Sequence, residues 1–199
     1  MRCFLGVILG RSIMFKRIAL LTSLLCTCLS ACGGNADSNA TYQCPGFTRI
    51  VNGTFTRSDK ILTWTMELES MPSEFTFNRA AVPDGMLDYA WQINVNADSI
   101  GLPELLVTVE HAKSPGESEV TSQDVLAKTQ HQLWRIDTAA NQARSVAQLD
   151  VTLDGKVFTF NVPGDAAPEL ATVTSPSQSV WQTMYRYGGV TEVCKDTWP

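Results

Sequence analysis

The chain has 199 residues, 44% of them hydrophobic, and carries 20 acidic against 15 basic residues, for a net charge of −5. Four of the basic residues precede residue 18, so the remainder is more acidic than the whole. Nucleic acids are bound through clustered lysine and arginine, which makes them unsuitable partners for this chain.

The first thirty residues have the pattern of a secretory signal. Lys16 and Arg17 precede a short apolar run that begins at Ile18 and ends in small residues. A cationic head, an apolar segment of about 7 to 15 residues and a small-residue exit are typical of such signals. A membrane span would need about 20 apolar residues. We expect translation to start at Met14, because the segment before it would put the charges in the middle of the leader.

Three cysteines end the apolar run, at Cys26, Cys28 and Cys32. Zinc sites pair cysteines two residues apart with a second ligand pair, and redox motifs read C-x-x-C, so neither alternative fits this spacing in a hydrophobic leader. The tetrapeptide LSAC that ends at Cys32 resembles the lipobox of bacterial lipoproteins. The resemblance implies removal of a signal peptide, residues 1–31, and three acyl chains such as palmitate on Cys32. Because residue 33 is glycine rather than aspartate, it also implies delivery to the outer membrane.

Cleavage there would remove four basic and no acidic residues, leaving 168 residues with a net charge of −9. This length is typical of one domain. Residues 32–43 are small and polar, which predicts a flexible tether, and residues 44–199 would form the domain. In the oxidising envelope we expect Cys44 and Cys194 to form a disulfide that closes a loop of about 150 residues. Two independent thiols are the alternative.

Alternating apolar and polar residues dominate the domain and predict half-buried strands. Trp64 in ILTWTMEL and Trp91 in YAWQINV lie on the apolar sides of their strands, so we expect both in the core. Asp154-Gly155 between two β-rich runs predicts a tight hairpin. About seven to nine short strands, frequent turn signals and little helical spacing favour an all-β fold, a jelly-roll-like antiparallel β-sandwich. The one helical candidate is a short piece within residues 122–132.

The order of these features resembles the β-sandwich of family 9 carbohydrate-binding modules and the related DOMON domains. The likeness covers roughly residues 50–187. It comprises a GTF…ILTWTMEL hairpin, FTFNR, a tyrosine-x-tryptophan strand leading to a turn that ends in Gly101, the Asp-Gly hairpin, and a closing Val162-Pro163. The resemblance implies a sandwich that binds carbohydrate, although one fold can host many functions.

The resemblance also implies a cation site. Members of this group often carry two aspartates after the tyrosine-x-tryptophan strand and bind calcium there. The matching positions hold Asn96 and Asp98, with Glu104 close in sequence. Ca²⁺ takes six to eight oxygen ligands, and Asn96 supplies an amide oxygen in place of a carboxylate. The alternative is a turn rich in turn-forming residues.

A candidate ligand platform lies in the last expected strand. Trp181, Tyr185 and Tyr187 share one side, opposite Val180 and Met184. If the latter two face the core, the aromatic rings face solvent, where they could stack on sugar rings. Packing of the aromatics in the core is the alternative.

Catalytic patterns are lacking in the sequence. His111 and His131 belong to no H-x-x-x-H or H-E-x-x-H pattern, and neither a nucleophile elbow nor a P-loop occurs. We therefore expect a non-catalytic envelope lipoprotein whose sandwich binds a ligand, with carbohydrate the leading class. The alternative is an envelope protein that docks onto another protein, or has a structural role, with no small ligand.

Overall fold

The computed structural model describes residues 43–77, 82–115, 120–122 and 125–199. Strands and short 3-10 helices make up its regular structure. The strands are β1 (Ile50–Arg57), β2 (Ile61–Leu68), β3 (Phe75–Phe77), β4 (Leu87–Val95), β5 (Leu105–Ala112), β6 (Val120–Ser122), β7 (Gln130–Asp137), β8 (Gln142–Gln148), β9 (Asp150–Asp154), β10 (Val157–Pro163), β11 (Ser179–Gly188) and β12 (Glu192–Trp198). The 3-10 helices are η1 (Gly46–Thr48), η2 (Val125–Lys128), η3 (Pro168–Thr172) and η4 (Pro176–Gln178). Over these ranges, no helix has the length and apolar character needed to cross a membrane.

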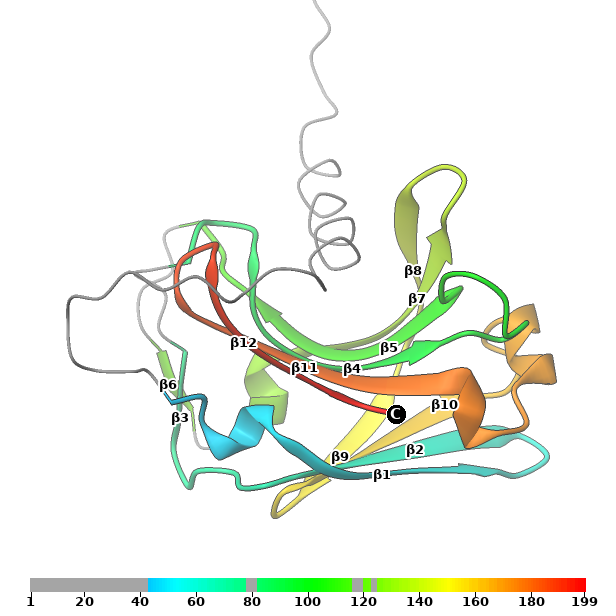
Figure 1. Ribbon diagram of the computed structural model, residues 1–199, viewed down its shortest axis with the longest axis horizontal. Helices are drawn as coiled ribbons and strands as arrows, with labels where there is room; N and C mark the ends of the chain where they lie inside the picture. Colours follow the sequence, from blue (N-terminus) through cyan, green and yellow to red (C-terminus); the bar gives the residue numbers. More distant parts are fainter. Residues whose placement is uncertain (1–42, 78–81, 116–119, 123–124) are drawn as a thin grey trace, which may run out of the picture. The chain divides into compact units, whose positions relative to one another are not determined.

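Two antiparallel sheets lie face to face (Figure 1). One has four strands in the order β1-β2-β10-β9, and the other has six in the order β12-β11-β4-β5-β7-β8. β3 and β6 form a separate two-stranded ladder. The arrangement confirms the expected all-β antiparallel sandwich, and the described residues form more strands than the seven to nine expected.

The core lies between the two sheets and is rich in large aromatic residues. Trp64 and Trp91 are 0% and 1% exposed, which confirms their predicted core positions. Each indole nitrogen has a partner: Trp64 Nε1 donates to Ser179 Oγ, and Trp91 Nε1 donates to the carbonyl oxygen of Phe47, both at 2.9 Å. Since Trp64 lies in β2 and Ser179 in β11, the first of these bonds joins the two sheets.

Two glycines fit the backbone where a side chain would not. Gly155 has φ +57° in the predicted turn between β9 and β10, a left-handed conformation that glycine adopts without strain. Gly53 in β1 faces the indole rings of Trp181 and Trp198, and a Cβ there would lie 2.9 Å from atoms of both. Glycine thus lets β1 approach the larger sheet closely. The short helix expected within residues 122–132 corresponds to η2.

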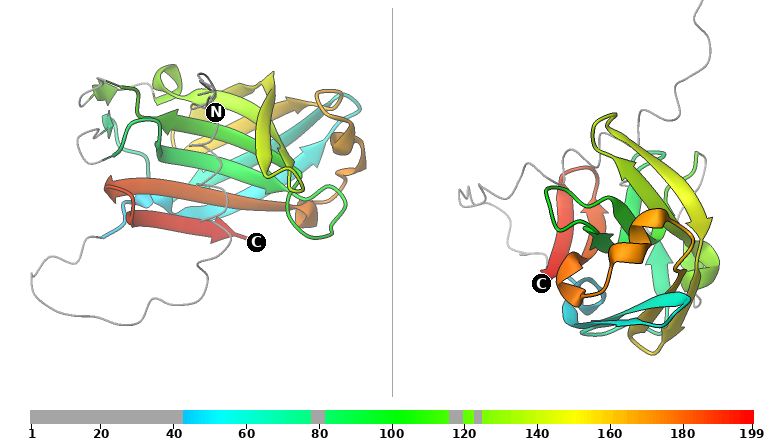
Figure 2. Two further views of the ribbon diagram at one scale, coloured as in Figure 1. Left: turned by 90° about the horizontal axis from the view of Figure 1, so that it is seen from above. Right: turned by 90° about the vertical axis from the view of Figure 1, so that its right-hand side faces the viewer.

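We call the side of the six-stranded sheet that points away from the four-stranded sheet its outer face. The sheet curves, so that the β7-β8 hairpin and the turn between β11 and β12 both rise away from the smaller sheet (Figure 1). The left view of Figure 2 looks onto this face, where β12, β11, β4 and β5 lie side by side.

Candidate functional site

The aromatic stripe expected to form a sugar platform lies on the inner side of β11. Trp181 is 1% exposed, and its Nε1 donates to the carbonyl oxygen of Thr65 in β2 at 2.7 Å. Val180 on the other side is 42% exposed. The prediction of a solvent-exposed platform is therefore wrong. Apolar residues occur on both sides of β11, and the larger aromatic side chains fill the space between the sheets.

The two tyrosines of the stripe are half-buried. Tyr185 stacks on Tyr89 with the ring centroids 4.7 Å apart, and meets the edge of Phe47 at 5.3 Å. Tyr187 follows at 6.2 Å from Tyr185, with the ring planes inclined by 47°. The rings are thus not coplanar, and Tyr185 belongs to the packing between η1 and the larger sheet.

Asn96 and Asp98, the expected calcium ligands, lie in the loop between β4 and β5. Oδ1 of each accepts a hydrogen bond from the backbone N–H of Ile100, at 3.1 and 2.7 Å. Oε2 of Glu104 accepts from the N–H of Ala97 at 2.8 Å. The side chains therefore close the loop on its own backbone. No group of three His, Cys, Asp or Glu residues in the described ranges is placed to hold a metal ion. Calcium binding here stays a prediction.

Glu104 and Asp98 are close enough to perturb each other. Burial raises the pKa of Glu104 above its ordinary value of 4.5, and the neighbouring Asp98 raises it further through a hydrogen bond and through charge repulsion. The backbone N–H groups of Ala97 and of Glu104 itself act in the opposite direction. When two carboxyl groups repel each other in this way, a shared proton or a bound cation stabilises the pair.

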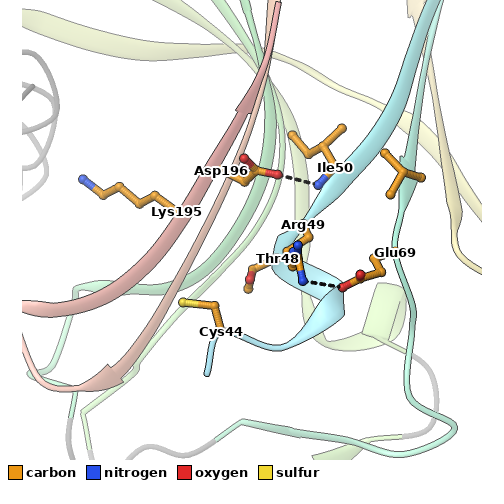
Figure 3. A pocket seen from close by; sticks show the side chains of 8 residues that line it. Cys44, Thr48, Arg49, Ile50, Glu69, Lys195 and Asp196 are labelled. Atoms are coloured by element: carbon orange, nitrogen blue, oxygen red, sulfur yellow. Dashed lines mark hydrogen bonds and ion pairs between the residues drawn. The ribbon is translucent and has the colours of Figure 1, made fainter. Parts of the chain in front are cut away.

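The predicted disulfide is confirmed, and it lies beside a cavity of about 350 Å³. Cys44 and Cys194 are bonded across 150 positions of sequence, which ties the segment just before η1 to β12. Figure 3 shows Asp196 of β12 reaching β1, where its Oδ2 accepts from the N–H of Ile50 at 2.7 Å. The cavity thus lies where the edge strands of the two sheets meet. We assign it a structural role, because these contacts join the two sheets.

Both histidines have polar partners. Nδ1 of His111 lies 3.0 Å from Oδ1 of Asp88, and both side chains are buried. Nε2 of His131 lies 3.0 Å from the hydroxyl oxygen of Thr129. The sequence places neither in a catalytic motif, and these contacts assign no reaction to them.

A polar row that sequence reasoning missed crosses the outer face of the six-stranded sheet. Strand register places one residue from each strand side by side. In spatial order from β12 to β8 the members of this amide row are Thr197, Gln182, Gln92, Thr108, Gln132 and Gln148. Their neighbours along the strands, such as Trp91 and Leu133, belong to the core, so the row points to the opposite side. The row carries no formal charge.

The amides on β4 and β11 are linked to one another. Oε1 of Gln182 accepts from Nε2 of Gln92 at 2.6 Å and from Nδ2 of Asn94 at 3.2 Å. These bonds use one polar atom of each amide, so each keeps its other atom for further bonding. Farther along the row, Oε1 of Gln132 is a buried acceptor with no hydrogen-bond partner in the described chain.

One tryptophan, Trp134, lies in the row next to the amide row. Trp134 lies two residues after Gln132 on β7 and opposite Leu106 of β5. Neither Trp134 nor Leu106 belongs to the core cluster or packs against it. Trp134 is half-buried. The sequence signal was present in the alternation of QHQLW, where Leu133 marks the inner side.

Among the described elements, no strand or 3-10 helix lies over the outer side of β4 and β5 (Figure 1). On their inner side, β4 and β5 pack against the four-stranded sheet, where Trp91 contacts Phe158 of β10. At the centre of the row, Gln92 is 9% exposed and Thr108 is 1% exposed. We therefore define the surface by strand register and side-chain direction. We call Gln92, Asn94, Gln132, Trp134 and Gln182 the amide face.

Charged residues flank the amide row on one side. The adjoining row holds Lys195, Met184, Ala90 and Glu110. Arg186 follows on β11, where its Nε donates to the carbonyl oxygen of Leu87 at 2.9 Å and its Nη1 donates to that of Val190. Burial lowers the pKa of Arg186. These two hydrogen bonds tie Arg186 to β4 and to the turn between β11 and β12.

No protein-family model, curated protein or solved structure matches this chain. The resemblance to carbohydrate-binding modules therefore stays a prediction beyond the sandwich itself. Cys32, the expected site of lipid attachment, lies outside the described residues.

Proposed function

We propose that this protein is a bacterial envelope lipoprotein whose β-sandwich binds carbohydrate on the amide face. The observation that carries the ligand class is the amide row: a line of uncharged donors and acceptors on the outer face of the six-stranded sheet, with one tryptophan beside it. Sugars are bound through hydroxyl hydrogen bonds and through contact of their C–H faces with aromatic rings.

The anchor is proposed from the sequence. The apolar leader and the LSAC tetrapeptide support cleavage before Cys32 and acylation of that residue. Two acyl chains already hold a protein firmly on a membrane, so three would make attachment permanent. Mass spectrometry of the native protein tests this: a mature chain beginning at acylated Cys32 supports the anchor, and an intact unmodified leader contradicts it. In Cys32→Ser, the protein should no longer enter the detergent phase.

Binding is tested on the mature protein purified from membranes in detergent. Electrophoresis through gels that contain soluble neutral polysaccharides, namely a mixed-linkage β-glucan, a xylan and a glucomannan, should show retardation by at least one of them. A protein without carbohydrate affinity would migrate as it does in an empty gel with all three. Such a result would contradict the proposed ligand class.

One observation favours the alternative, docking onto another envelope protein. Ile100 is 74% exposed and Leu102 is 42% exposed in the same loop, at an end of β4 and β5. Exposed apolar residues at a loop tip can mark a protein contact. In cells, a photo-crosslinker at residue 100 should then give one defined product that disappears in Leu102→Asp. Absence of any product would contradict this alternative.

A further inference from the structure

Resting on the proposed function, we infer that the ligand is a neutral polysaccharide that lies across the strands along the amide row. Trp134 stacks on one of its rings, and the amides of Gln92, Asn94 and Gln182 bind its hydroxyls. This assigns the orientation of the ligand, the residues that hold it and its charge class.

The row has the dimensions of an extended ligand. It crosses all six strands of the sheet, and five strand spacings of about 4.8 Å give a length of roughly 24 Å. A line of this length accommodates several linked sugar rings. A ligand running along a strand would instead meet apolar Met184 beside Gln182 on β11, and Ala90 beside Gln92 on β4.

The bonding capacity of the row matches hydroxyl groups. A hydroxyl both donates and accepts, and a side-chain amide does the same. After their mutual bonds, Gln182 keeps its amide nitrogen as a donor, while Gln92 and Asn94 keep their oxygens as acceptors. Oε1 of Gln132 is a buried acceptor without a donor in the described chain, a condition that costs free energy until a donor arrives.

Trp134 is placed to add an apolar contact at the β7 end. It follows Gln132 on the same face, and it lies outside the core cluster that holds Trp64, Trp91 and Trp181. An indole ring attracts the C–H face of a sugar and shields apolar area from water. The amides of β4 and β11 and the indole of β7 would thus hold different rings of one chain.

The charges favour a neutral ligand over an anionic one. The amide row has no formal charge, and the adjoining row holds one residue of each sign, Lys195 and Glu110. The chain as a whole has 20 acidic residues against 15 basic ones. A polyuronate would therefore meet net repulsion without a cluster of cations to offset it.

The test measures the affinity of the mature protein for neutral polysaccharides and for two polyuronates, alginate and polygalacturonate. The face variants are Trp134→Ala and the double variant Gln92→Ala/Gln182→Ala. Asn161→Ala is the matched control, because this amide lies on β10 in the other sheet, where it accepts from the hydroxyl of Thr63. Thermal melting establishes that each variant is folded.

We expect Trp134→Ala to weaken neutral polysaccharide binding about tenfold, the loss of one aromatic contact. Trp134→Phe should retain most of the affinity, because it keeps an aromatic ring. The double amide variant should lose at least as much as Trp134→Ala, and Asn161→Ala should bind as the unaltered protein does. Neither polyuronate should bind more tightly than the best neutral polymer.

The outcomes separate this inference from the proposed function. If the unaltered protein binds a neutral polysaccharide and the folded face variants bind it equally well, the inference is overturned and the proposed function stands. If it binds no polysaccharide at all, both fail. Tighter binding of a polyuronate overturns the neutral charge class. A dimer that dissociates in Trp134→Ala, without polysaccharide binding, would show that the face binds a second copy instead.

Discussion

Loss of the disulfide should destabilise the domain more than any single contact. Cys44 and Cys194 are separated by 150 positions, so the bond closes nearly the whole domain into one loop. In the chain-entropy model, closing a loop of this length stabilises the folded state by about 5 kcal/mol, because it restricts the unfolded chain. At about 2–4 °C per kcal/mol for a domain of this size, the melting temperature should fall by roughly 10–20 °C.

The assay is thermal unfolding of the double variant Cys44→Ser/Cys194→Ser, which leaves no single thiol behind. Dithiothreitol should lower the melting temperature of the unaltered protein to that of the variant and should leave the variant unchanged. A drop of less than about 2 °C in the variant would refute the loop-entropy reasoning. Insensitivity of the unaltered protein to the reductant under unfolding conditions would show that the bond is absent.

Three further predictions concern packing and the loop between β4 and β5. Gly53→Ala should cost about 1–3 kcal/mol of unfolding free energy, because the added Cβ would lie 2.9 Å from two indole rings; exposed Asn52→Ala should stay within about 0.5 kcal/mol. Trp181→Phe should lower the unfolding free energy by about 1–3 kcal/mol, because it leaves the Thr65 carbonyl without its donor, and urea titration measures the loss. Glu104→Gln should be more stable than the unaltered protein at neutral pH, because the raised pKa of Glu104 means that folding disfavours its charge. That advantage should shrink as the pH falls through the folded pKa. If Ca²⁺ binds the loop, it should raise the melting temperature of the unaltered protein and leave Glu104→Gln unmoved; no shift would contradict the calcium prediction.

Local pattern was sufficient to predict the sandwich and its central residues. Trp64 and Trp91 each alternate with polar neighbours on their own strand, so one strand decides which side is buried. Gly155 likewise predicts its hairpin, because the turn requires a left-handed backbone conformation that glycine adopts without strain. Cys44 and Cys194 could be paired because, apart from Cys32, no other cysteine remains after the expected cleavage.

The ligand platform could not be predicted from one strand. β11 carries apolar residues on both sides, with Val180 and Met184 opposite Trp181 and Tyr185, so its periodicity does not say which side faces the other sheet. The choice depends on the space between the sheets and on the acceptor that Thr65 offers to Trp181. Both are tertiary properties.

The amide row was missed for a different reason. Its members lie on different strands, far apart in sequence, and only strand register brings them into one line. Gln92 and Gln182 are 90 positions apart yet hydrogen-bonded at 2.6 Å. Each of these glutamines, taken alone, is an ordinary polar residue of a half-buried strand.

The most direct test of the account is a crystal structure of the mature protein with an oligosaccharide from the polymer that it binds most tightly. The account predicts density for the sugar chain across β11, β4, β5 and β7, with one ring against Trp134 and hydroxyls bonded to Gln92 and Gln182. A sugar bound on the four-stranded sheet, or at the loop that carries Ile100, would contradict it.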